Sequence, residues 1–149
     1  MTRKLASEYL ADRQVLTSHC IYTIKHSSDL LELSAGGGGR YSVGLCWVTG
    51  KKMVDEARIS GERVPIIFAP AQATEYLFAW ALLDDVALRR NTTTYSFSSF
   101  CFLPEETYKK KSLIRWNGKR LHANYIKHYA ICKTPSFIAG MAMEITEKR

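Results

Sequence analysis

The 149-residue sequence has few cysteines and no paired metal-ligand motif. Its four cysteines are far apart in the chain, and no CxxC or CxxH pair accompanies them. This spacing argues against a zinc knuckle and against a CxxC redox site. We therefore expect buried, reduced thiols that pack as small apolar side chains, and we expect neither a metal nor another cofactor.

Long hydrophobic runs are also missing. No apolar stretch approaches the roughly 18 residues that a membrane-spanning helix needs. The first residues, MTRKLASEYLADRQ, are polar where a secretory signal has an apolar core. The sequence therefore predicts no membrane association and an intracellular location, either cytoplasmic or nucleoid-associated.

Acidic residues are absent between Glu106 and Glu144, a stretch that contains eight lysines and arginines. Segregated positive charge is typical of a surface that follows phosphates, because each neutralised phosphate releases condensed counterions. A solvated basic hairpin that only promotes solubility is the alternative. The candidate phosphate-binding residues are Lys109, Lys110, Lys111, Arg115, Trp116, Lys119 and Arg120.

A chain of this length forms one ordinary domain with a sizeable core. We expect an N-terminal helical appendage over residues 1–16, a single domain over residues 17–143 and a tail over residues 144–149. About six strands with short helices between them, never in a regular βαβ order, predict an α+β fold. The expected architecture is a twisted mixed sheet, curved into a small barrel or pseudo-barrel.

Apolar and β-branched runs give the expected strands at residues 20–25, 64–69, 76–83, 95–103 and 125–132. The pair 64–69 and 76–83 is expected to be antiparallel, with Pro65 at the start or edge of its strand. Short helices are predicted over residues 51–57, from Ser27 and Ser28 through Leu33, and after Pro135. Residues 89–94 are predicted to form a loop, and Asp84-Asp85 to end a strand. Trp80 is expected in the core, whereas Trp47 lies in a Gly/Thr-punctuated segment beside the sheet and is a candidate stacking surface.

The dipeptide Asn117-Gly118 between apolar and basic flanks predicts a tight hairpin turn. Trp116 lies beside this turn and near Arg115, Lys119 and Arg120. The hairpin is therefore expected to present a stacking ring together with cations, as nucleic-acid contacts require.

Three segments, IYTIKHS, GLCWVTGKK and GERVPIIFAPAQATEYLFAWALLDDV, resemble the core of the PUA-like superfamily, which includes the EVE, YTH and ASCH domains. The resemblance covers roughly residues 20–86. It implies a pseudo-barrel whose pocket accepts a flipped or single-stranded base, often a methylated one, between aromatic side chains. Stacking and hydrogen bonds to the base edge offset the cost of extruding it.

Transferred by position, the resemblance makes Trp47 the first aromatic side chain of the pocket and places Lys25, His26 and Ser27 against the base or backbone. Tyr41 and Thr49 complete the predicted base-binding pocket. The sequence thus favours a module that binds nucleic acid, RNA or DNA, and reads a modified base.

An ASCH-like hydrolase that acts on modified nucleosides or RNA is the alternative. Thr49, Lys51 and Lys52, with Glu75 or Asp84, would then supply the nucleophile and the acid/base groups. A protein-interaction module built on the same sheet is a third class, and it would not need segregated positive charge.

Overall fold

The computed structural model describes residues 16–25, 39–43, 47–70, 75–104, 106–121 and 129–138. Within them the chain forms six strands, the helix α3, one 3₁₀ turn and, as predicted after Pro135, a helical segment that is described over residues 136–138. In chain order these are β1 (His19–Lys25), β2 (Gly39–Val43), α3 (Val48–Ile59), β3 (Val64–Pro70), β4 (Ala79–Arg89), β5 (Thr92–Phe102), η1 (Lys110–Ser112) and β6 (Tyr129–Lys133).

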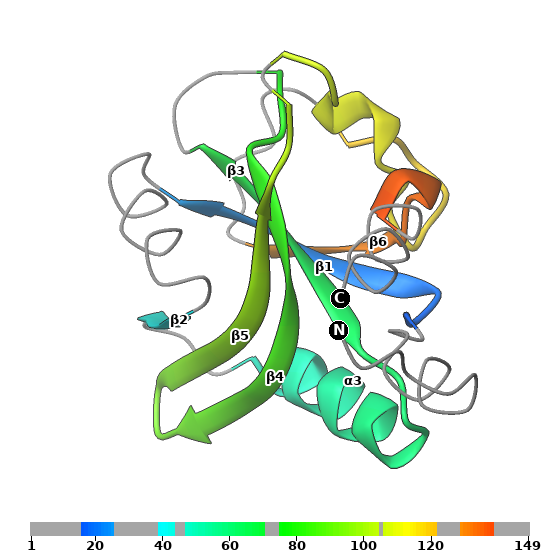
Figure 1. Cartoon of the computed structure of the whole chain (residues 1–149). Coiled ribbons are helices and arrows are strands. Elements are labelled where there is room, and N and C mark those ends of the chain that lie inside the picture. The colour runs from blue at the N-terminus through cyan, green and yellow to red at the C-terminus, as the bar shows by residue number, and fades with distance from the viewer. Residues whose placement is uncertain are drawn as a thin grey trace, which may run out of the picture.

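All six strands belong to one mixed sheet with the order β2-β5-β4-β3-β1-β6 (Figure 1). β1 and β3 are parallel, and every other neighbouring pair is antiparallel. The chain passes through β2 and α3 between the two parallel strands. The predicted α+β class is therefore confirmed.

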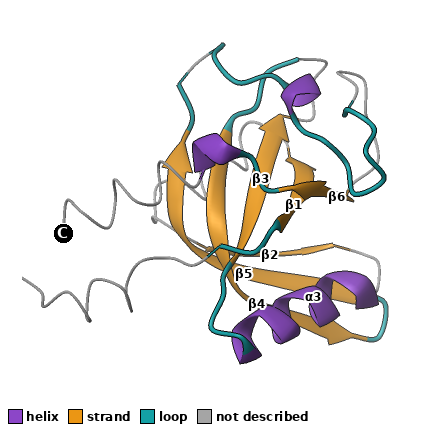
Figure 2. Cartoon of the chain, turned by 90° about the vertical axis from the view of Figure 1, so that its right-hand side faces the viewer, coloured by secondary structure: helices purple, strands orange, loops and turns teal. Residues whose placement is uncertain are grey.

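The sheet is strongly coiled. Three strands separate β5 from β6 in the sheet order, yet the rings of Tyr95 on β5 and Tyr129 on β6 lie 5.5 Å apart. Trp47, at the start of α3, stacks on Tyr129, and both rings pack against the same apolar cluster. α3 packs against β4 and β3, and Figure 2 shows it running alongside β4. The concave face of the sheet thus encloses one apolar cluster that α3 covers.

Both faces of the sheet are buried, which explains the continuous apolar sequence of β3. Ile66 and Phe68 point into the cluster under α3, whereas Ile67 and Ala69 point into a second cluster on the other face. The second cluster also contains Trp80, which is fully buried as predicted. The segment after β5 covers this cluster with leucines and aromatic rings. A strand that is buried on both faces is apolar at every position and does not alternate between apolar and polar residues.

β4 is longer than predicted and continues through Asp84 and Asp85 to Arg89. The β4–β5 ladder contains a register shift at this point. Arg63 forms an ion pair with Asp84, and Arg58 donates a hydrogen bond of 3.2 Å to Asp85. The prediction that the two aspartates end a strand was wrong because paired arginines allow both carboxylates to lie along it.

The predicted loop over residues 89–94 was also wrong. Arg89 pairs with Thr92 across a two-residue turn in which Arg90 has a φ of 49°. β-Branched threonines favour strand geometry, so β5 begins directly after the turn at Thr92. Figure 1 shows β4 and β5 as one long bent hairpin.

The predicted first strand, the helix after Trp47 and the antiparallel pair of β3 and β4 are confirmed. Pro65 lies near the start of β3, as expected. Most of the N-terminal appendage, the helix predicted at residues 27–33 and the tail at residues 144–149 lie outside the described residues. The last strand is described from Tyr129 onward.

Three cysteines are described, and each is a free thiol. Cys20 lies opposite Cys132 in the β1–β6 ladder, and both are fully buried, whereas Cys101 is half-buried. Burial raises the pKa of Cys132 to about 12, although the nearby Arg115 guanidinium opposes this increase. Burial also raises the pKa of Cys20 well above its ordinary value.

In the native protein at pH 8, iodoacetamide is expected to alkylate Cys20 and Cys132 far more slowly than Cys101. The thiolate is the reactive form, and at the two fully buried sites the raised pKa leaves almost none of it at this pH. Burial also raises the pKa of Cys101, but its side chain is only half-buried and reagent can reach it. Timed quenching followed by peptide mass spectrometry measures each site separately. Denatured protein is the control, in which all three should react alike. Native-state labelling of Cys132 at the rate of Cys101 would contradict the buried β1–β6 pair.

Candidate functional site

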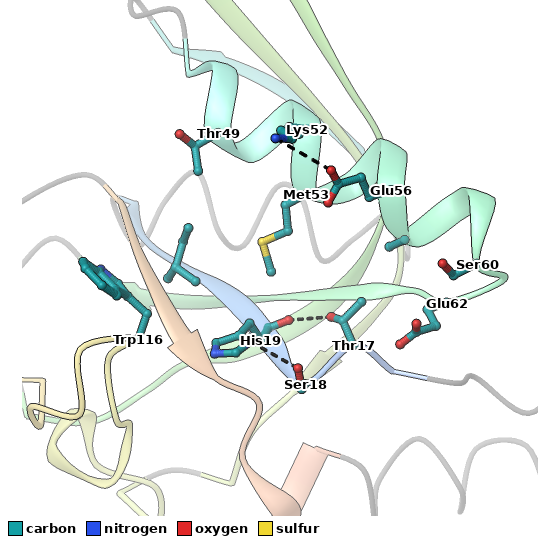
Figure 3. A pocket seen from close by; sticks show the side chains of 12 residues that line it. Thr17, Ser18, His19, Thr49, Lys52, Met53, Glu56, Ser60, Glu62 and Trp116 are labelled. Carbon is teal, nitrogen blue, oxygen red and sulfur yellow. Dashed lines mark hydrogen bonds and ion pairs between the residues drawn. The ribbon is translucent and has the colours of Figure 1, made fainter.

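An open groove of about 640 Å³ lies between α3 and the turn at Asn117-Gly118 (Figure 3). We call it the α3–hairpin groove. Five parts of the chain line it: α3, the residues just after α3, the start of β1 with the two residues before it, β6 and the turn. Segments that are distant in sequence therefore meet at this site.

One side of the groove is a single face of α3. Thr49, Lys52, Met53 and Glu56 line it, and their spacing of three, four and seven residues places them together on a helix. Val54, on the opposite face, is buried against the sheet. Lys52 and Glu56 form an exposed ion pair of 3.9 Å, which contributes little stability. Both charged groups thus remain available to a ligand.

The residues before β1 form the floor. The Thr17 N–H donates to the Arg63 carbonyl at 3.0 Å, and the Thr134 hydroxyl donates to the Thr17 carbonyl at 2.7 Å. The Ser18 hydroxyl lies 3.1 Å from Nδ1 of His19. In Figure 3 the His19 ring lies below Met53 of α3. This part of the groove is therefore polar and fixed to the sheet.

Trp116 forms the far side of the groove and has 65% of its surface exposed. The predicted tight turn is confirmed: Gly118 has a φ of +84°, and its N–H donates to the Arg115 carbonyl at 2.8 Å. The Trp116 N–H donates to the Ile131 carbonyl of β6 at 2.9 Å. The backbone of Trp116 is thus fixed to β6, while most of its ring is exposed to solvent.

Trp47, the stacking side chain predicted from sequence, has a different position. Its ring stacks on Tyr129 with centroids 4.7 Å apart and planes inclined by 16°. The backbone N–H of Trp47 donates to the Thr93 hydroxyl at 2.8 Å. Burial raises the pKa of Tyr129 to about 12, and a side-chain hydrogen bond with Tyr95 partly offsets the increase. Trp47 does not line the α3–hairpin groove; its ring packs where the coiled sheet closes.

Of the other residues in the predicted base-binding pocket, Thr49 lines the groove. Lys25 is at the end of β1 that is distant from the groove, because the groove is formed at the start of that strand. His26, Ser27 and the side chain of Tyr41 lie outside the described residues. Of this set, the structure describes the side chains of Trp47 and Thr49 alone, and both lie at the start of α3.

The residues proposed for the hydrolase alternative do not all line the groove. Lys51 forms a 3.0 Å ion pair with Asp55 and donates to the Val86 carbonyl at 3.2 Å. Glu75 pairs with Lys109 at 3.7 Å and does not line the groove. Only Thr49 and Lys52 of the proposed set lie together there, and Asp84 is paired with Arg63 on β4.

The three consecutive lysines do not form one surface. Lys109 pairs with Glu75 and lies 5.8 Å from the centre of the Tyr76 ring. Lys110 is only 3% exposed, because its N–H donates to the Glu75 carbonyl and the 3₁₀ turn packs its side chain inward. Burial lowers its pKa. The expectation that Lys110 presents its charge on the surface is therefore corrected.

The remaining basic candidates lie nearer to the turn. Lys111, Lys119 and Arg120 are exposed, and the Arg120 guanidinium donates to the Lys111 carbonyl at 3.2 Å. Arg115 is half-buried and lies opposite Cys132 in a β-bridge. The exposed cations thus gather on the arms of the hairpin that carries Trp116.

Sequence reasoning missed His19, Met53, Glu56 and Ile131 as groove residues. The helical spacing in VTGKKMVDEARI could have indicated Met53 and Glu56 once Thr49 and Lys52 were considered. No local signal indicates His19 or Ile131, because each reaches the groove through sheet pairing with distant strands.

The packing of Trp47 gives a test at Gly50 of α3. A Cβ at Gly50 would lie 2.3 Å from a carbon of the Trp47 ring. Gly50→Ala is therefore expected to lower the free energy of unfolding by about 1–3 kcal/mol through overpacking. In a Trp47→Ala background the same change should stabilise the helix by up to about 1 kcal/mol. Urea denaturation of the four proteins measures the coupling, and an equal effect of Gly50→Ala in both backgrounds would contradict this position of Trp47.

Within the described ranges, no group of three or more His, Cys, Asp or Glu side chains could hold a metal ion. The helices in that part of the chain include none that is long and apolar enough to cross a membrane.

No protein-family model matches the chain, and no curated protein matches it. Its function is therefore inferred from the side chains and the geometry of the groove.

Proposed function

We propose that this protein binds single-stranded nucleic acid and stacks a base on Trp116 in the α3–hairpin groove. The observation that supports this most strongly is the exposed Trp116 ring at the side of a preformed groove. Of the two other tryptophans, Trp80 is fully buried, and Trp47 is partly buried with its ring stacked on Tyr129. Every base has a flat face, so one exposed indole can stack on any of them.

The size and lining of the groove suit a nucleotide. Its volume of about 640 Å³ lies within the range of small-molecule sites. Met53 and Ile131 supply apolar surface, and Thr49 and Ser18 supply hydroxyl groups. A base needs this combination of an apolar face and polar groups at its edge.

The charges favour one orientation of the ligand. Glu56 and Glu62 lie on the α3 side, where their carboxylates repel phosphate but accept hydrogen bonds from base amino groups. Exposed cations lie on the hairpin side, at Lys119 and Arg120. The base would therefore point toward α3 and its phosphates toward the hairpin.

The coiled mixed sheet also supports the resemblance to the PUA-like superfamily, and we propose a pseudo-barrel of that type. In this proposal the base-stacking role moves from Trp47 to Trp116. Recognition of a modified base remains part of the proposal, because the carboxylates and hydroxyls of the groove would contact groups at the base edge. The hydrolase alternative is weaker, since Glu75 is paired with Lys109 and does not line the groove with Thr49 and Lys52.

Trp116→Ala is expected to weaken binding of a labelled single-stranded oligonucleotide by about 1–3 kcal/mol, which is roughly 5- to 150-fold in Kd. Fluorescence anisotropy with RNA and DNA of the same sequence, unmodified and base-methylated, measures the change. Trp116→Phe should retain most of the affinity, because it keeps a stacking ring. The matched control is Phe102→Ala, which removes another exposed ring that is 53% accessible and does not line the groove.

Equal affinities of the wild type and Trp116→Ala would exclude this groove as the binding site. Binding that responds to salt but not to the Trp116 substitution would leave only a non-specific basic surface. A preference for a methylated oligonucleotide that disappears in Trp116→Ala would support the reading of a modified base.

A further inference from the structure

The hairpin arm before Asn117 extends the sheet beyond β6. Arg115 forms an antiparallel bridge with Cys132. The Trp116 N–H donates to the Ile131 carbonyl at 2.9 Å, and the Lys133 N–H donates to the carbonyl of residue 114 at 2.7 Å. Residues 114–116 therefore pair with β6 on its outer edge, opposite β1.

This register places four side chains in one row across four strand segments. Arg120 lies opposite Ile114, Ile114 lies opposite Lys133, and Lys133 lies opposite His19. Side chains directly opposite one another in a ladder project from the same face. We call Arg120, Ile114, Lys133 and His19 the basic row.

Trp116 is the first residue of the turn, and it lines the α3–hairpin groove together with Ile131 and with His19 of the basic row. Ile131 is two residues from Lys133 along β6, and two residues of a strand span about 7 Å. The stacking ring and the basic row are therefore separated by a distance of the order of one nucleotide. Arg115 and Cys132, next to the basic row, project to the opposite face.

A second cavity, of about 420 Å³, follows the same ladder beyond the α3–hairpin groove. Ile114 and Lys133 line it, as do the polar residues Ser112, Thr134 and Ser136. Tyr108, Pro135 and Phe137 give this cavity an apolar side as well, so it offers both kinds of contact beside the basic row.

The charges of the row have no acidic partner in the described part of the chain. Lys133 and Arg120 are exposed, and no ion pair involves either of them there. Adjacent strands are about 4.8 Å apart, so their long side chains can converge above Ile114. Nδ1 of His19 lies beside the Ser18 hydroxyl, which leaves Nε2 as the ring nitrogen for a ligand.

We propose that the basic row is a phosphate-binding site, and that the ligand of the groove is a nucleotide unit whose phosphate lies there while its base stacks on Trp116. An arginine and a lysine flanking a short apolar side chain suit one phosphate, with the guanidinium as a forked donor and the ammonium as a point charge. This proposal rests on the proposed function and adds Lys133 and His19 to the site.

The test compares four common nucleosides with their 5′- and 3′-monophosphates as probes, with affinities taken from NMR titrations. The wild type is expected to bind at least one monophosphate about 10-fold more tightly than its nucleoside. In Arg120→Gln/Lys133→Gln this preference should fall to about 2-fold or less. Trp116→Ala should weaken nucleoside and monophosphate alike. Arg89→Gln removes an exposed charge on β4 outside the groove and should keep the full preference.

A single-stranded oligonucleotide gives an independent readout. Loss of one phosphate contact should reduce the slope of log K against log salt concentration by about 0.7 in the double variant, with no change in Arg89→Gln. Circular dichroism checks that each variant is folded.

Equal binding of nucleoside and monophosphate by the wild type would overturn the phosphate site but leave base stacking intact if Trp116→Ala still weakened both. A preference that survives in the double variant would also overturn it. Absence of binding to every nucleoside, monophosphate and oligonucleotide would refute the proposed function and, with it, this inference.

Discussion

The candidate site depends on one interaction, the pairing of residues 114–116 with the outer edge of β6. Its two backbone hydrogen bonds position Trp116 beside Ile131 and align Ile114 with Lys133. An edge strand left open would present unpaired backbone groups to any extended chain. Here residues 114–116 pair with backbone groups on the outer edge of β6. The same pairing fixes the backbone of Trp116, so its exposed indole is held more firmly than it would be in a flexible loop.

The coiling of the sheet supplies the other half of the site. Because β5 and β6 approach each other at Tyr95 and Tyr129, α3 can lie over the concave face and still reach the side of the sheet where the hairpin is attached. Trp47 fills the position at which the curled sheet meets the start of α3. The Trp47 ring is partly buried there and already stacks on Tyr129, whereas the Trp116 ring is mostly exposed. This difference in packing favours Trp116 as the stacking surface.

The sequence was sufficient for features that depend on local chemistry. The apolar runs of β1 and β3, the helix after Trp47 and the Asn117-Gly118 turn were each predicted near their observed positions. The sequence was insufficient to predict the burial or the position of a side chain where these depend on contacts with distant segments of the chain. Lys110 is buried where its segment pairs with residues 75–77, and His19 reaches the groove through its ladder with Lys133. The contact between Trp47 and Tyr129 was unforeseen for the same reason, since the two residues are 82 positions apart in the chain.

The most direct test of the account is a titration of ¹⁵N-labelled protein with a single-stranded oligonucleotide, observed through the indole N–H signals of its three tryptophans. Trp116 has an exposed ring in the groove, Trp47 is stacked on Tyr129 and Trp80 is in the core. The account predicts that the Trp116 signal shifts with saturation while the Trp80 signal does not move and the Trp47 signal moves little. A dominant shift of Trp47, with Trp116 unchanged, would contradict it.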